Sequence, residues 1–159
     1  MFMQKALKFL HTLASCGFIG GLLAYMIVLL KAPQDTASTY ANVRLTISHL
    51  SNYILIPSLA VVLVSGLLSM AVHKPFQEKR WVWIKALLGL SLFEATLAIV
   101  QSKVDYAAKI SVKIAEGNAK ADALSVSLST EWYSLSALMV LSIANIVLGV
   151  WRPSLRKRT

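Results

Sequence analysis

The apolar residues of the chain fall into four long blocks that are separated by more polar segments. A helix needs about 20 predominantly apolar residues to cross the hydrocarbon core of a bilayer, so each block predicts a transmembrane helix. The pattern therefore predicts an all-α integral membrane protein, a four-helix bundle in which residues 1–159 form a single transmembrane domain. The predicted spans are residues 8–30, 49–72, 81–101 and 132–151.

The third predicted helix continues beyond the membrane. After residue 101, apolar residues such as Val104 and Ala108 recur at helical spacing between charged ones. This amphipathic pattern predicts a helical extension over residues 102–117 that projects into water and ends near Gly117, a residue suited to a C-cap. The segment of residues 31–48 is expected to be a polar connection.

Small residues indicate how the first two helices pack. Gly17 and Gly21 form a GxxxG pair on one face of the first helix, which lets a neighbouring helix approach closely. Ser58, Ser65 and Ser69 form the small polar face of the second helix, which is the expected partner. Pro57 is expected to loosen the second helix, because proline has no N–H to donate.

Ionisable side chains gather near one end of the predicted bundle. His11 and Lys85 each lie about 6 Å inside a helix end, and His73 closes the second helix on that side. Imidazole is a common axial ligand of haem, and small residues near His11 would leave room for a ring. Three plainer roles compete: a helix–helix hydrogen bond for His11, a Lys85 ammonium at the headgroups, and a loop position for His73.

Glu94 lies deep inside the third span, about 20 Å from the end that carries Lys85. An ionised carboxylate is costly at this depth. At α-helical spacing Glu94 shares a row with Gln101 and Asp105, so this row is expected to face the bundle interior. Glu94 is then either a neutral hydrogen-bonding residue between helices or part of a proton or ligand path.

Composition agrees with a membrane protein. The chain has 159 residues, 57% hydrophobic and 14% charged, with a mean hydropathy of +0.64. Its net charge of +9 comes from basic residues that flank the spans, so topology explains it and nucleic-acid binding is not expected. More of these residues lie on the side of the two termini, which predicts cytoplasmic termini in a bacterial inner membrane.

Several chemistries lack their minimum sequence parts. The chain has no CxxC, HExxH, P-loop or GxGxxG motif, and its methionines fall at different depths. Zinc hydrolysis, nucleotide binding and a thioether copper path are therefore not expected, and no metal site is predicted. The lone Cys16 excludes an intramolecular disulfide.

Short motifs along the whole chain resemble those of a bacterial family of predicted integral membrane proteins of unknown function. The motifs are Leu10-His11, Gly17, Gly20-Gly21, Arg44-Leu45, Leu55-Ile56-Pro57-Ser58, Ser65-Gly66, Trp81 and Trp151-Arg152-Pro153. That family is similar in turn to the HemJ-like and CopD-like four-helix proteins.

This second likeness implies specific roles. HemJ-type proteins carry a functional histidine in the first helix and a lysine in the third, bind haem b and act in protoporphyrinogen oxidation. His11 and Lys85 match those two positions. After the first helix, however, the HemJ pattern has a Pro-Arg and a Tyr-His, whereas this chain has the residues at 29–34, Leu-Leu-Lys-Ala-Pro-Gln. The resemblance thus implies haem binding by analogy and leaves enzymatic activity open.

Three functional hypotheses follow. The first is haem b binding or redox chemistry at the end that carries His11 and Lys85. The second is a non-catalytic membrane subunit or assembly factor that holds partners with its GxxxG face and projecting helix. The third, a proton-coupled carrier around Glu94, would need copies to assemble around a path. The expected contacts are the lipid bilayer and either further copies of the chain or a membrane partner.

Overall fold

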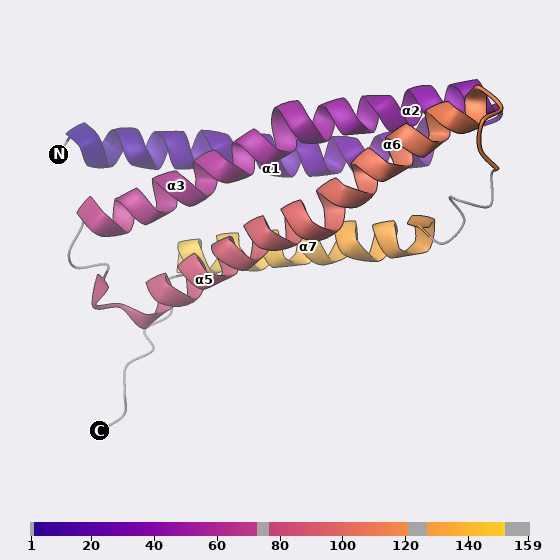
Figure 1. The fold of residues 1–159 in the computed structure, drawn as a ribbon. Helices are drawn as coiled ribbons and strands as arrows, with labels where there is room; N and C mark the ends of the chain where they lie inside the picture. Colours follow the sequence, from indigo (N-terminus) through magenta and orange to yellow (C-terminus); the bar gives the residue numbers. More distant parts are fainter. Residues whose placement is uncertain (1, 73–76, 121–126, 152–159) are drawn as a thin grey trace.

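Four helical rods make up the structure, a computed structural model that describes residues 2–72, 77–120 and 127–151 (Figure 1). Four helices are long and apolar enough to cross a membrane, which confirms the predicted fold class. The elements are α1 (Phe2–Lys31), α2 (Ala37–Leu50), η1 (Ser51–Leu55), α3 (Ile56–Val72), α5 (Arg80–Ala95), η2 (Thr96–Gln101), α6 (Ser102–Ala115) and α7 (Ser127–Trp151). Each η element is a π-helical segment that joins its neighbours into one continuous rod.

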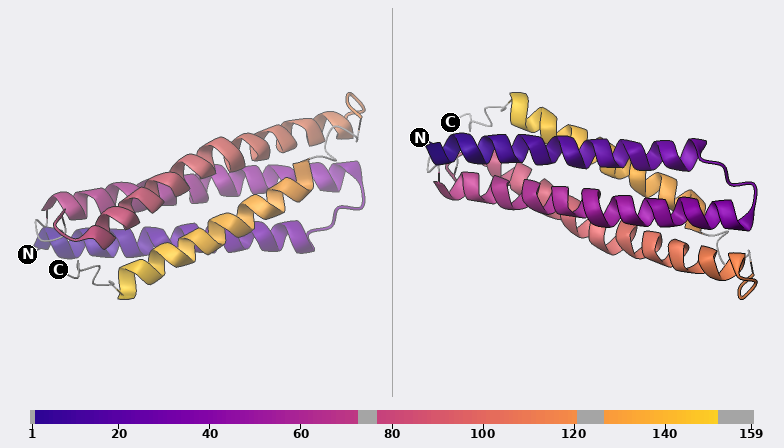
Figure 2. Two further views of the ribbon diagram at one scale, coloured as in Figure 1. Left: turned by 90° about the horizontal axis from the view of Figure 1, so that it is seen from below. Right: turned by 90° about the horizontal axis from the view of Figure 1, so that it is seen from above.

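The rods lie lengthwise side by side (Figure 2). The main pairings are α1 with α3, α2 with α6, and α5 with α7. We call the end that holds Phe2 and Trp151 the terminal end, and the end that holds Lys31 and Ala37 the distal end.

The predicted polar connection over residues 31–48 is wrong beyond Thr36, because α2 begins at Ala37. The Thr39 N–H donates to Thr36 Oγ1 over 3.1 Å, and the Thr36 N–H donates to Thr39 Oγ1 over 3.0 Å. This reciprocal cap satisfies backbone donors that would otherwise be unpaired at the helix start. The helix thus runs about 18 Å further toward the distal end than the predicted span.

The extension of the third helix therefore does not project alone. The rods that contain α2 and α6, Ala37–Val72 and Arg80–Ala115, have 36 residues each. Each is about 54 Å long, whereas the hydrocarbon core is about 30 Å thick. Both rods must extend beyond the membrane, and α2 packs along α6 there. As predicted, a C-cap ends α6: Gly117 has a φ of 77° and the Asn118 N–H donates to the Lys113 carbonyl over 2.7 Å.

The loosening expected at Pro57 takes the form of a π turn. The Ile56 N–H donates to the Ser51 carbonyl, five residues back, rather than four. Because Pro57 cannot donate to the backbone, the widened turn lets the rod continue from α2 into α3.

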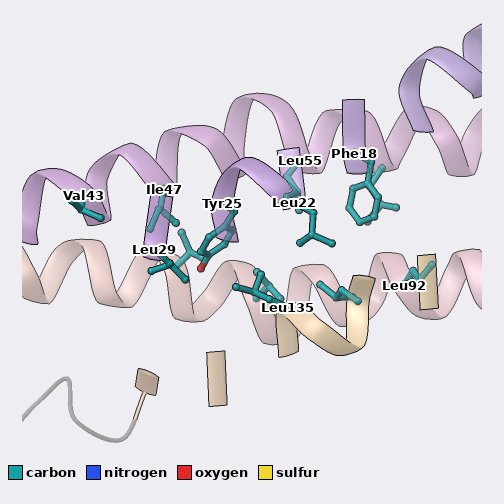
Figure 3. Packing of buried hydrophobic residues seen from close by; sticks show 13 residues of the cluster. Phe18, Leu22, Tyr25, Leu29, Val43, Ile47, Leu55, Leu92 and Leu135 are labelled. Carbon is teal, nitrogen blue, oxygen red and sulfur yellow. The ribbon is translucent and has the colours of Figure 1, made fainter. Parts of the chain in front are cut away.

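The glycine face of α1 packs closely on the second rod, as predicted, but of the predicted serine face it meets only Ser58. A Cβ atom added at Gly17 would lie 2.7 Å from Ser58 Oγ, and one at Gly21 would lie 3.3 Å from Ile54 Cγ2. The apolar core of the bundle lies next to this contact of α1 with the second rod (Figure 3). Its members include Phe18, Leu22, Tyr25, Leu29, Val43, Ile47, Leu55, Leu92 and Leu135.

Candidate functional site

His11 is half-buried and turned toward α3. Its Nδ1 lies 2.9 Å from the Val62 carbonyl oxygen and 3.1 Å from Ser65 Oγ. A carbonyl only accepts, so this contact assigns the proton to Nδ1 and leaves the lone pair on Nε2. A Cβ atom added at Gly66 would lie 3.4 Å from His11 Cε1, so the glycine gives the ring its space.

Lys85 and Asn145 extend this polar region to α5 and α7. The Lys85 ammonium lies against Gly149, where even a methyl group would collide with it. Lys85 therefore contacts α7 and is within electrostatic range of His11. The Asn145 side chain faces Gly89, and its Oδ1 is buried with no hydrogen-bond partner in the part of the chain that the structure describes.

These side chains form one layer. His11, Ser65, Lys85 and Asn145, which we call the polar layer, lie about 7 to 14 Å from the terminal ends of their four helices. Lys85 lies about 7 Å from the start of α5, close to the depth inferred from the sequence. His11 lies about 14 Å from the start of α1, deeper than inferred, because the helix begins at Phe2. His73 lies outside the described residues. Within the described ranges no cluster of three His, Cys, Asp or Glu residues suits a metal ion.

Ser69 stands apart from this layer. Its hydroxyl donates to the Ser65 carbonyl of its own helix over 2.7 Å, whereas the Ser65 hydroxyl donates to the Val61 carbonyl over 2.6 Å. Of the two serines, Ser65 is buried and contacts α1 through His11.

A second polar site, which the sequence interpretation missed, lies toward the distal end. Arg44 and Glu131 are 1% and 5% exposed and pair across α2 and α7. Arg44 Nη1 donates to both carboxylate oxygens, over 2.8 and 2.9 Å, and Arg44 Nε donates to the Tyr40 hydroxyl over 2.9 Å. The Tyr25 hydroxyl also donates to Glu131. We call these four residues the charged cluster.

Arg44 falls in the predicted polar connection of residues 31–48, and Glu131 immediately precedes the predicted span of residues 132–151, so neither was expected to be buried. One signal was available: Tyr40 and Arg44 are four residues apart and therefore stack on one face of a helix. The Arg44 guanidinium carbon is 5.2 Å from the centroid of the Tyr40 ring. A helix over residues 37–50 would have revealed the Tyr40–Arg44 pair. It would not have revealed the acidic partner of Arg44, because Glu131 is 87 residues away in the sequence.

The two π-helical segments are joined by hydrogen bonds. Ser51 Oγ donates to Gln101 Oε1 over 2.6 Å, and Gln101 Nε2 donates to Asn52 Oδ1 over 2.9 Å and to Asp105 Oδ2 over 3.0 Å. Ser48 Oγ also donates to Asp105 Oδ1 over 3.1 Å. This bridge pairs the polar groups of η1 with those of η2 and α6, at the position where the third predicted span ends.

Comparison with known protein families places the chain in a family. The family model described as a predicted integral membrane protein (DUF2269) covers residues 5–153, nearly the whole chain. The chain belongs to this family. Searches of curated proteins and of solved structures found no match to the chain. The DUF2269 assignment agrees with the resemblance drawn from the motifs, whereas the likeness to HemJ-like and CopD-like proteins stays a prediction.

In this DUF2269 protein, Glu94 is exposed on α5 rather than buried inside the bundle as expected. Along an α-helix, Glu94 and Gln101 would share a face. The π turn η2 inserts about one extra residue, which rotates the later residues by about 100°. Gln101 and Asp105 therefore face α2 and η1, while Glu94 faces away from the core.

This geometry also bears on two of the hypotheses. The surfaces suggested for partner binding are used within the chain, because Gly17 faces α3, Gly21 faces η1 and the projecting α6 packs on α2. A membrane-subunit role would need a different surface. An exposed Glu94 also lies outside any path that a single copy of the bundle could enclose.

Proposed function

We propose that this integral membrane protein binds haem b in the polar layer, where His11 Nε2 would hold the iron. The observation that carries the proposal is the 2.9 Å contact between His11 Nδ1 and the Val62 carbonyl. Ligating histidines characteristically donate their second ring N–H to a carbonyl or carboxylate, which orients the ring and fixes the tautomer. His11 meets that requirement.

The polar side chains around His11 suit haem. Lys85 would supply positive charge for an acidic substituent of the ring. The buried Asn145 Oδ1 would accept a hydrogen bond from such an acid group in its protonated form. Both residues belong to helices other than α1, as a site between helices of a bundle requires. Bound haem would supply one-electron redox chemistry, while this chain would hold and orient it.

The visible absorption spectrum of the detergent-purified protein tests haem ligation. After expression with haem supplied, the wild-type protein should show a Soret band, and His11→Ala should lose most of it. His49→Ala is the matched control: His49 is exposed, stacks on Tyr53 with ring centroids 6.0 Å apart, and should not affect the band. A colourless wild-type protein, or an unchanged band in His11→Ala, would sink the proposal.

We also propose a bacterial inner membrane location with the terminal end in the cytoplasm, which the excess of basic residues at that end supports. In a Cys16→Ser background, single cysteines at the exposed positions Asn118 and Glu78 report the two sides. A membrane-impermeant maleimide added to spheroplasts should label Asn118→Cys and not Glu78→Cys until the membrane is opened. The reverse labelling pattern would contradict the assignment.

A further inference from the structure

Glu94 lies on the outside of the bundle within a membrane-spanning rod. It is 13 residues beyond Trp81 and seven before Gln101, about 20 Å and 10 Å along the helix axis. It makes no hydrogen bond or ion pair with the residues that the structure describes. Its surroundings on α5 are exposed and apolar, with Leu87 66% and Leu90 43% exposed.

This position is costly for a bundle that stands alone in lipid. Charged side chains near the centre of a membrane cost about 2.5 to 3.5 kcal/mol on insertion scales, and ionisable residues in spans are almost always paired or face a protein interior. The Glu94 side chain is short, so it cannot extend to the headgroups as a lysine does. A second protein surface that covers Glu94 would remove the cost.

A second copy of the same chain meets the chemical requirement. Two copies inserted with the same orientation and related by a two-fold axis along the membrane normal have parallel α5 helices, which places identical residues opposite each other at the same depth. Two carboxyl groups in contact do not both ionise, and a protonated one donates a hydrogen bond to its counterpart. The Glu94 side chain of one copy can therefore form a hydrogen bond with Glu94 of a second copy.

The residues beside Glu94 permit such an approach. Ser91 and Ala98, one turn before and one turn after Glu94, are both exposed and small. Small residues let the backbones of two membrane helices come close. We propose that the face of α5 and η2 formed by Ser91, Glu94 and Ala98 is the contact between two copies of this chain, and that the paired Glu94 carboxyls hold it.

Self-association in liposomes tests the proposal. Copies with donor and acceptor fluorescent fusions are reconstituted over a range of protein-to-lipid ratios, and energy transfer gives the dissociation constant. Glu94→Leu should weaken the dimer by about tenfold or more, whereas Glu94→Gln, which keeps a donor and an acceptor, should retain it. Ser136→Leu, a change at an exposed polar residue of α7, is the control and should leave the constant unaltered.

Cross-linking locates the contact independently. In a Cys16→Ser background, Ala98→Cys should form disulfide-linked dimers on oxidation, and Ile143→Cys on the exposed surface of α7 should not. Unchanged helix content in Glu94→Leu separates lost contact from lost folding. The proposal is overturned by a monomeric wild type at every density, by normal dimerisation of Glu94→Leu, by no cross-link at position 98, or by a different membrane protein that occupies the Glu94 face stoichiometrically.

Discussion

Replacing Arg44 with alanine should destabilise the folded bundle by about 3 to 5 kcal/mol, the usual cost of removing one partner of a buried ion pair. The variant leaves the Glu131 carboxylate buried among apolar side chains with only the Tyr25 hydroxyl as a donor. Because the pair joins α2 to α7, the distal half of the bundle should loosen most. Detergent-solubilised protein unfolded by increasing SDS, followed by tryptophan fluorescence, gives the change in free energy.

Two further variants separate the unpaired charge from the lost bulk. The double variant Arg44→Met, Glu131→Leu should recover most of the stability, since apolar pairs of similar volume often replace a buried ion pair at little cost. Arg80→Ala removes an exposed arginine and should change the free energy by no more than about 0.5 kcal/mol. If Arg44→Ala proved as stable as Arg80→Ala, the charged cluster would not support the fold as described.

Gly149→Leu should have the second-largest effect, a destabilisation of about 1 to 3 kcal/mol from overpacking between α5 and α7. The new side chain would enter the space that holds the Lys85 ammonium and force it out of the polar layer. Thermal unfolding in detergent measures the stability. If haem is bound, a shifted Soret band would report the displaced lysine.

Gly20→Leu is the matched control for this variant. No atom lies within 4 Å of a Cβ added at Gly20, so leucine there should be tolerated and should gain helix propensity. Combining Gly149→Leu with Lys85→Ala should restore part of the lost stability, because it removes the colliding side chain. Equal melting temperatures for Gly149→Leu and Gly20→Leu would contradict the packing of Lys85 against α7.

The two polar sites give the ends of the bundle different properties. In the charged cluster, Arg44 Nη1 and Nε and the Glu131 carboxylate all have protein partners, so the cluster is suited to holding helices together. In the polar layer, Asn145 Oδ1 has no partner among the described residues, and His11 presents Nε2 as an acceptor. Polar atoms without hydrogen-bond partners, next to a basic side chain, are better suited to binding a ligand than to a purely structural role.

Local properties of the chain were sufficient to predict the four spans and the contact between the first two. A membrane-length apolar block must form a helix, because lipid offers no partner for unpaired backbone groups. Gly17 and Gly21 share a face through the regular α-helical rotation, so their role in close packing could be inferred from spacing. The ends of the helices were harder to predict. The capping box at Thr36 has a threonine where a glutamate or glutamine is usual, so the start of α2 was not recognised.

The sequence by itself determined that this chain is a bundle of membrane helices with His11 and Lys85 near the same end, because length, hydropathy and rise per residue are properties of each helix alone. Only the tertiary structure decided which side chains meet. Arg44 and Glu131 pair from helices distant in sequence, and the π turn of η2 rotates Glu94 out of the row that an unbroken α-helix would give. Pairing across helices and small changes of helical phase depend on packing in three dimensions, which periodicity along one helix does not contain.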